Sequence, residues 1–145
     1  MTSGERSTVR AFLDAYRAAF ETFDAAAVAD LFHYPCQITS GGAEVTVAVI
    51  PTRDAWMPQL ERLVAAYRAI GVRSAEARAV DVAEITTRLA GALVHWSLFD
   101  EQGRPIYDFD ASYTLADLGE GMRITAIAHN ETPHLRAAIE RQRLT

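Results

Sequence analysis

The sequence predicts an α+β domain in which helices pack on one face of a bent, largely antiparallel sheet. Three observations lead to this prediction. Apolar residues recur at helical spacing in the first 70 residues, four long strand-like runs separated by turn residues fill most of the rest, and half of the 145 residues are hydrophobic. A chain of this size and composition can bury one core, so we expect a single domain over residues 1–145.

The first half of the chain predicts two helices. The first spans about 5–22 and has an apolar stripe of Val9, Phe12, Leu13, Tyr16 and Phe20. Asp24 can then accept the free backbone N–H groups of a second, short helix. That helix should end near His33, because Pro35 disfavours a helical conformation at the residue before it.

A hairpin and a third helix follow. Two β-rich runs, 36–39 and 44–50, flank Gly41 and Gly42, a pair typical of a tight turn. Apolar residues then recur at helical spacing over 54–70, and Gly71 provides the stop. Pro58 is expected in the first turn of this helix, where the missing N–H costs least.

Four strands are predicted in the second half, over 72–83, 88–99, 104–116 and 122–131. The connections at 100–103 and 117–120 carry the Asp and Gly residues of tight antiparallel turns. Pro133 should stop the last strand, and the segment after it predicts only one or two helical turns.

Composition excludes several classes of function. The net charge of −5 has the wrong sign for binding nucleic acid or anionic membranes. All 14 basic residues are arginine, which excludes a Schiff-base or phosphate-loop lysine. The one cysteine, Cys36, is expected as a small buried strand residue, and no histidine spacing indicates a metal site. Without an apolar leader or membrane-length run, a cytoplasmic location is expected.

Two segments resemble a known family. The stretch FLDAYRAAFETFDAAAVADLFHYP and the ending YTLADLGEGMRITAIAHNE, in this order of elements, are similar to the nuclear transport factor 2-like superfamily, which includes ketosteroid isomerases and SnoaL-like polyketide cyclases. The resemblance implies a cone-shaped α+β barrel with a strongly curved six-stranded mixed or antiparallel sheet and three helices on its concave face. It also implies a hydrophobic cavity and a homodimer formed through the outer face of the sheet.

The resemblance suggests catalytic candidates. Tyr16 matches the tyrosine that donates a hydrogen bond in ketosteroid isomerases, and Asp110 falls near the position of their protonated aspartic acid. The position of their catalytic base falls near Ser40, which is not a base at neutral pH. Alternation over 107–115 places Asp110 on the face opposite the apolar residues, which favours an outward position, whereas the match to the family's aspartic acid favours the cavity. Both positions stay open.

Histidines and aromatics complete the candidate site. His33 follows the second helix where the cavity is expected to open, and His95 lies in a central strand where burial would make it a usable base. The alternative position for His95 is the dimer interface. Further aromatic residues come from elements that the fold would bring around one cavity, where they would bind a ligand or fill the core: Phe20, Phe32, Tyr34, Trp56, Tyr67 and Trp96.

Two functions therefore stay open. The first is an enzyme that acts on a small hydrophobic or carbonyl-bearing molecule by acid/base chemistry without a cofactor, as an isomerase, cyclase, dehydratase or hydrolase. The second is a non-catalytic dimeric binding or assembly module of the same fold. The absence of a carboxylate near Ser40 favours the second function, whereas Tyr16 and Asp110 favour the first.

Overall fold

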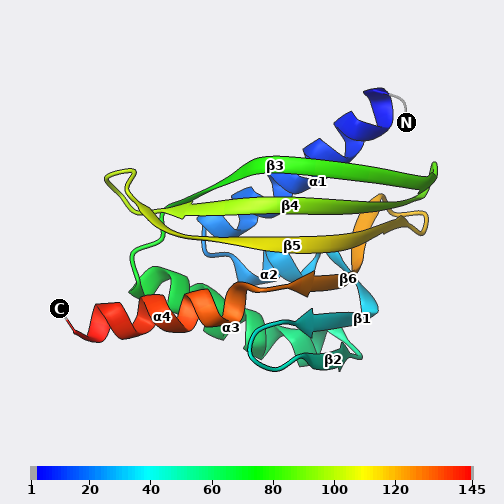
Figure 1. Ribbon diagram of the computed structural model, residues 1–145. Helices are drawn as coiled ribbons and strands as arrows, with labels where there is room; N and C mark the ends of the chain where they lie inside the picture. The colour runs from blue at the N-terminus through cyan, green and yellow to red at the C-terminus, as the bar shows by residue number, and fades with distance from the viewer. Residues whose placement is uncertain (1–2, 145) are drawn as a thin grey trace.

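A computed structural model describes residues 3–144 of the chain (Figure 1). The helices are α1 (Ser3–Glu21), α2 (Ala25–Ala29), α3 (Arg53–Ala69) and α4 (Glu131–Arg143). The strands are β1 (Phe32–Ser40), β2 (Thr46–Ile50), β3 (Ser74–Thr86), β4 (Leu89–Phe99), β5 (Pro105–Asp117) and β6 (Met122–His129). No helix in the described part of the chain is both long enough and apolar enough to cross a membrane.

The six strands form one mixed sheet in the order β2-β1-β6-β5-β4-β3. Strands β1 and β6 pair in parallel, and every other neighbouring pair is antiparallel. Helices α1, α2 and α3 lie on one side of the long strands β3, β4 and β5, and α4 continues from the end of β6 (Figure 1). The predicted fold class, α+β with helices covering one face of a six-stranded mixed sheet, is confirmed.

Local sequence signals explain several helix ends. The Asp24 carboxylate accepts a hydrogen bond from the backbone N–H of Ala27 at 3.0 Å, as predicted. The Thr52 hydroxyl caps α3 in the same way, and Gly71 ends that helix with a φ of +87°. The predicted place of Pro58 is wrong, because it lies inside α3 beyond the first turn.

The second helix is shorter than predicted. It ends at Ala29 rather than near His33, and β1 begins at Phe32. The Leu31 carbonyl accepts a hydrogen bond from the backbone N–H of Ile124, at 2.9 Å. This bond to β6 draws the chain into the sheet before the helix can continue, so Tyr34 and Pro35 belong to a strand.

The end of the chain departs furthest from the prediction. The last strand stops at His129, and a full fourth helix replaces the expected one or two turns, so the structure has four helices where three were predicted. Pro133 is the third residue of α4, where its missing N–H would have had no partner within the helix. Glu131 is therefore the first residue of a helix and not the end of a strand.

The core lies between the helices and the inner face of the sheet. Its most completely buried side chains include Val28, Leu60, Val94, Leu115 and Ile124, none more than 1% exposed. On β5 the inward residues alternate with outward polar ones, as the sequence pattern predicts. Cys36 is buried and unpaired, as predicted, and burial raises the pKa of its thiol to about 11.

Candidate functional site

A cavity of about 100 Å³ lies between α1, α3 and the inner face of the sheet. A cavity of about 150 Å³ accommodates benzene in another protein, so this smaller one takes at most a single six-membered ring. Mostly carbon lines it, and its residues include Tyr16, Phe20, Trp56, Leu60, Tyr67, Trp96, Leu98, Phe109, Tyr113, Ile127, His129 and Glu131. An apolar wall with a few polar groups is typical of small-molecule sites.

Five of the sequence-predicted aromatic candidates line this cavity: Tyr16, Phe20, Trp56, Tyr67 and Trp96. The other two are not among its lining residues. Phe32 is buried in the core with its ring centroid 5.6 Å from that of Trp56. The Tyr34 hydroxyl donates to the Ala29 carbonyl at 2.8 Å, which fixes it against α2.

Three of the four catalytic candidates lie away from the cavity. His33 is exposed on β1, because α2 ends too early to carry it toward the helices. His95 and Asp110 lie on the outer face of the sheet, because their sequence neighbours Trp96 and Phe109 point inward and side chains alternate along a strand. Of the two positions left open for His95 and Asp110, the structure shows the outward one, and the cavity position considered for His33 is not found. Of the four catalytic candidates, Tyr16 is the one that lines the cavity.

A carboxyl group that the sequence did not single out lies in the cavity wall. Glu131 is only 8% exposed, and its Oε2 accepts hydrogen bonds from the hydroxyls of Tyr67 and Tyr107, the latter at 2.8 Å. Burial raises the pKa of Glu131, and the two tyrosine hydrogen bonds offset part of that rise. Glu131 can thus hold a proton at a higher pH than an exposed glutamate.

His129 flanks this acid on the cavity wall. Its Nδ1 accepts a hydrogen bond from the backbone N–H of Glu131 at 3.1 Å. Burial lowers the pKa of His129, which favours the neutral ring. A neutral imidazole that accepts at Nδ1 carries its proton on Nε2, so His129 offers a hydrogen-bond donor and its basic nitrogen is already occupied.

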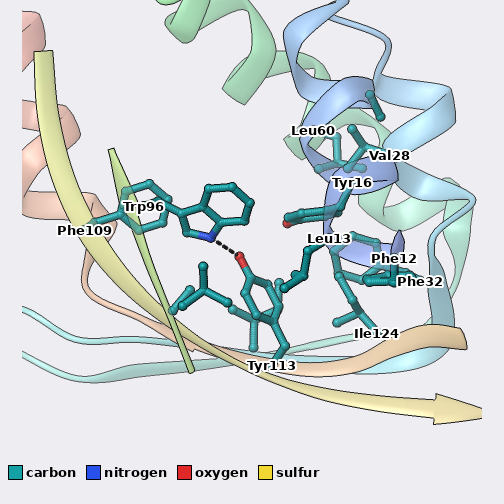
Figure 2. Close-up of a cluster of buried hydrophobic side chains, with 14 of the residues drawn as sticks. Phe12, Leu13, Tyr16, Val28, Phe32, Leu60, Trp96, Phe109, Tyr113 and Ile124 are labelled. Atoms are coloured by element: carbon teal, nitrogen blue, oxygen red, sulfur yellow. Dashed lines mark hydrogen bonds between the residues drawn. The ribbon is translucent and has the colours of Figure 1, made fainter. Parts of the chain in front are cut away.

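Tyr16 belongs to a second polar group, shown in Figure 2. Its ring meets that of Tyr113 edge-on with centroids 5.6 Å apart, and the indole N–H of Trp96 donates to the Tyr113 hydroxyl at 2.9 Å. Burial raises the pKa of Tyr16 well above its ordinary value, with a smaller contribution from Tyr113. The hydroxyl stays protonated at neutral pH and can donate to a ligand.

A groove reaches the same acid from another side. It has a volume of about 240 Å³ and is bounded by β1, β2, α3 and the start of α4. Five residues line both the groove and the cavity: Ile38, Trp56, Leu63, His129 and Glu131. Across the groove, the hydroxyls of Ser40 and Thr132 are hydrogen-bonded at 2.9 Å. Ser40 thus has a structural partner near the acid and is not a base.

Residues 5–132 match a protein family described as NTF2-like protein (DUF6841), where NTF2 is nuclear transport factor 2. The chain belongs to this family of NTF2-like proteins. The match extends over most of the chain, from the first helix to the Glu131–Thr132 segment beside the cavity. Among curated proteins, none matches the chain.

Solved NTF2-like structures share the fold. An NTF2-like protein of unknown function from Pseudomonas putida KT2440 aligns with a TM-score of 0.70 at 11% identity, covering 90% of this chain and 88% of the other. One from Novosphingobium aromaticivorans with a cystatin-like fold gives 0.67 at 17% identity, covering 94% and 89%. A protein from Streptomyces avermitilis, provisionally assigned as a dehydratase of the NTF2-like family, gives 0.63 at 13% identity, covering 86% and 93%.

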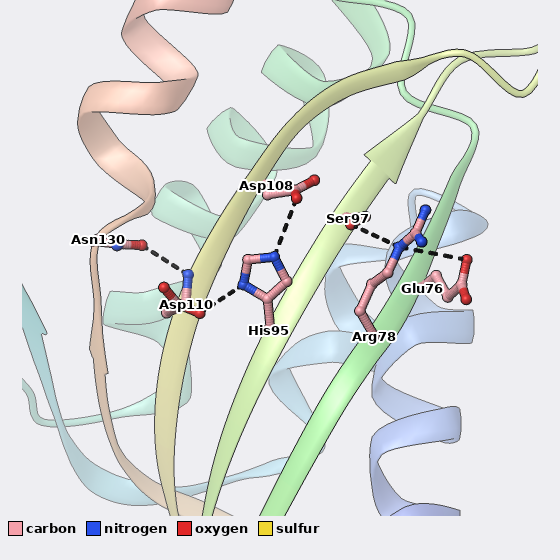
Figure 3. Close-up of polar contacts among 7 residues, drawn as sticks. All are labelled: Glu76, Arg78, His95, Ser97, Asp108, Asp110 and Asn130. Carbon is pink, nitrogen blue, oxygen red and sulfur yellow. Dashed lines mark hydrogen bonds and ion pairs between the residues drawn. The ribbon is translucent and has the colours of Figure 1, made fainter.

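The outer face of this NTF2-like sheet carries a separate charged cluster, shown in Figure 3. His95 lies between two aspartates, with Nδ1 2.7 Å from Asp110 and Nε2 3.1 Å from Asp108. Hydrogen bonds to Asp110 and then to Asp108 raise the pKa of His95. These side chains are about 40–55% exposed in the single chain and lie on the opposite face of the sheet from the cavity.

Over residues 7–144 of this NTF2-like chain, whose side chains the structure describes, no group of three or more His, Cys, Asp or Glu side chains is placed to hold a metal ion. The polar groups of the cavity are instead single donors and acceptors set among carbon. Such groups suit hydrogen bonding and proton transfer.

Sequence reasoning missed Glu131 and His129 as parts of one site. The signal was present in the segment His129-Asn130-Glu131-Thr132, which places an acid directly after the last strand. Reading Pro133 as a stop placed Glu131 in a strand, where its side-chain direction depends on alternation alone. Reading Pro133 as part of a helix's first turn would have placed the acid at the helix N-terminus.

Proposed function

We propose that this protein binds a small, largely hydrophobic carbonyl compound in the cavity and transfers a proton to or from it, with Glu131 as the acid/base group. The observation that carries the proposal is the buried Glu131 carboxyl, held by Tyr67 and Tyr107 in a wall made mostly of carbon. A buried carboxyl with a raised pKa holds its proton to a higher pH than an exposed glutamate, which suits it to act as an acid and as a base.

The neighbouring groups have supporting roles in this proposal. As a carboxylate, Glu131 takes a proton from the carbon next to the ligand's carbonyl, and as the acid it returns that proton to the same or a nearby carbon. The negative charge that develops on the carbonyl oxygen needs a hydrogen-bond donor. Tyr16 and His129 each line the cavity with a donor, and their pKa shifts keep Tyr16 protonated and His129 neutral.

The test uses 3-cyclohexen-1-one, a single-ring ketone whose double bond moves into conjugation when one proton is shifted. Conversion to 2-cyclohexen-1-one is followed by ultraviolet absorbance and corrected for the buffer-catalysed rate. We expect turnover by the wild type and a loss of about 100-fold or more in Glu131→Gln, the scale of a lost general acid/base. Glu120→Gln, at an exposed turn residue, is the matched control. Equal rates for Glu131→Gln and wild type would refute the role of Glu131.

We also propose that the protein forms a homodimer through the outer face of its sheet. Strand register places one cross-strand row on that face: Val47, Thr39, Ala128, Ser112, Leu93 and Asp81. Val47 and Leu93 are 60% and 51% exposed, and small side chains between them leave the face open to a partner. Light scattering should give a dimer mass that Leu93→Arg halves and that Ile85→Arg, at the exposed end of β3 next to the β3–β4 turn, preserves. A monomeric wild type would exclude this arrangement.

A further inference from the structure

The two tryptophans of the cavity differ in one respect. Both side chains line it, but the indole N–H of Trp96 donates to Tyr113, whereas the indole N–H of Trp56 is buried without an acceptor. Among residues 7–144, whose side chains the structure describes, Trp56 is the single side chain with such a buried, unpartnered polar atom. The aromatic neighbour of Trp56 is Phe32, whose ring packs edge-to-face against the indole and carries no oxygen or nitrogen acceptor.

A buried donor without an acceptor is unfavourable, and native proteins contain few of them. Trp56 lies in the wall of both the cavity and the groove, so a molecule that enters either space reaches this side chain. The same two spaces also share His129 and Glu131, which places the proposed proton-transfer group in the same walls as Trp56. The indole nitrogen itself has almost no accessible surface, so the ring must turn for its N–H to reach a ligand.

We propose that Trp56 recognises the ligand by donating its indole N–H to a carbonyl oxygen on a single-ring compound bound in the cavity. The inference rests on the proposed function and adds to it a specificity residue and a substrate class. The cavity volume sets the ring size, the unpartnered N–H sets the need for an acceptor, and the mostly apolar lining favours a ring that is otherwise carbon. The groove leaves space beyond Trp56 for a substituent.

The test compares two molecules of nearly the same shape. Acetophenone carries a carbonyl oxygen, and α-methylstyrene has a CH₂ group in its place. Binding of both to the ¹⁵N-labelled protein is followed by NMR, and the two indole N–H signals are assigned with Trp56→Phe and Trp96→Phe. Acetophenone should move the Trp56 indole proton downfield, as expected for a new hydrogen bond, and α-methylstyrene should not.

The variants isolate the hydrogen bond from changes in cavity volume. The preference for acetophenone over α-methylstyrene should fall about three- to tenfold in Trp56→Phe, the value of one neutral hydrogen bond. It should persist in Trp96→Phe, because that indole already has a partner. Taking the ratio of the two ligands within each variant cancels the effect of a larger cavity on both.

Each outcome decides a different statement. If both compounds shift signals of the cavity but the Trp56 indole signal stays in place, or if Trp56→Phe keeps the full preference, Trp56 is not the recognition group and cavity binding survives. If neither compound shifts any cavity signal, the cavity does not take a single ring, and the proposed function falls together with this inference. Should Trp56→Phe fail to fold, the wild-type indole signal alone decides.

Discussion

Replacing Glu131 with glutamine should change how the stability of the protein depends on pH. The folded state raises the pKa of Glu131 by burial. Below the unfolded pKa, near the ordinary glutamate value of 4.5, the carboxyl is protonated in both states and its burial carries no charge penalty. As the pH rises toward the folded pKa, the unfolded chain gains stability by ionising while the folded carboxyl stays neutral. The free energy of unfolding therefore falls over this interval, by about 1.4 kcal/mol per pH unit for one proton.

Glutamine does not titrate and can still accept from Tyr67 and Tyr107 through its side-chain oxygen. The unfolding free energy of Glu131→Gln minus that of wild type should thus rise by about 1.4 kcal/mol per pH unit across the interval and then level off above the folded pKa. Urea unfolding followed by circular dichroism, from about pH 4.5 to about pH 8, measures this difference. Glu120→Gln should track the wild type. Parallel curves for Glu131→Gln and wild type would show that Glu131 ionises normally in the fold.

Three further substitutions and one labelling experiment test individual features of the structure. Tyr107→Phe removes one hydroxyl from Glu131 and should cost about 1 kcal/mol of stability and raise the pKa of Glu131 further, which the same urea series detects. His95→Asn should lower the free energy of unfolding by less than about 1 kcal/mol. Because the fold raises the pKa of His95, this decrease has its full size below about pH 6.5 and disappears as the pH rises through the folded pKa. Cys36, with its pKa near 11 and its side chain buried, should react with a thiol reagent only after urea unfolding. Gly71→Ala should lower the melting temperature, since a φ of +87° costs an alanine about 1 kcal/mol.

Periodicity predicted most of the fold because each long element has one apolar side. The stripe that includes Val9, Phe12 and Tyr16 faces the core as predicted, and the alternation on β5 places Tyr113 inward. The parallel pairing of β1 with β6 could not be predicted in this way. It joins segments about 90 residues apart, and only the packed sheet, with hydrogen bonds such as that from Ile124 to Leu31, determines it.

The candidate site was harder to predict than the fold, because it depends on which way single polar side chains point. His95 and Asp110 have residue types suited to acid/base chemistry, yet strand register pairs them on the outer face. An apolar residue carried toward the wrong face would expose a large hydrophobic surface, so patterning constrains it strongly. A histidine or aspartate is stable on either face, so patterning constrains it weakly.

Glu131 reaches the cavity because its neighbours in sequence are fixed on both sides. Asn130 exchanges hydrogen bonds with Asp110 of β5, receiving the Asp110 N–H on Oδ1 at 2.8 Å and donating its own backbone N–H to the Asp110 carbonyl at 3.2 Å. Thr132 is bonded to Ser40 of β1. The first turn of α4 is thus held to strands on either side of β6, and the acid between these two contacts is directed at Tyr67 and Tyr107. The sequence comparison considered Asp110 as an acid and Ser40 as the place of a base. In the structure, these two residues instead hold the segment that positions the carboxyl group proposed to move the proton.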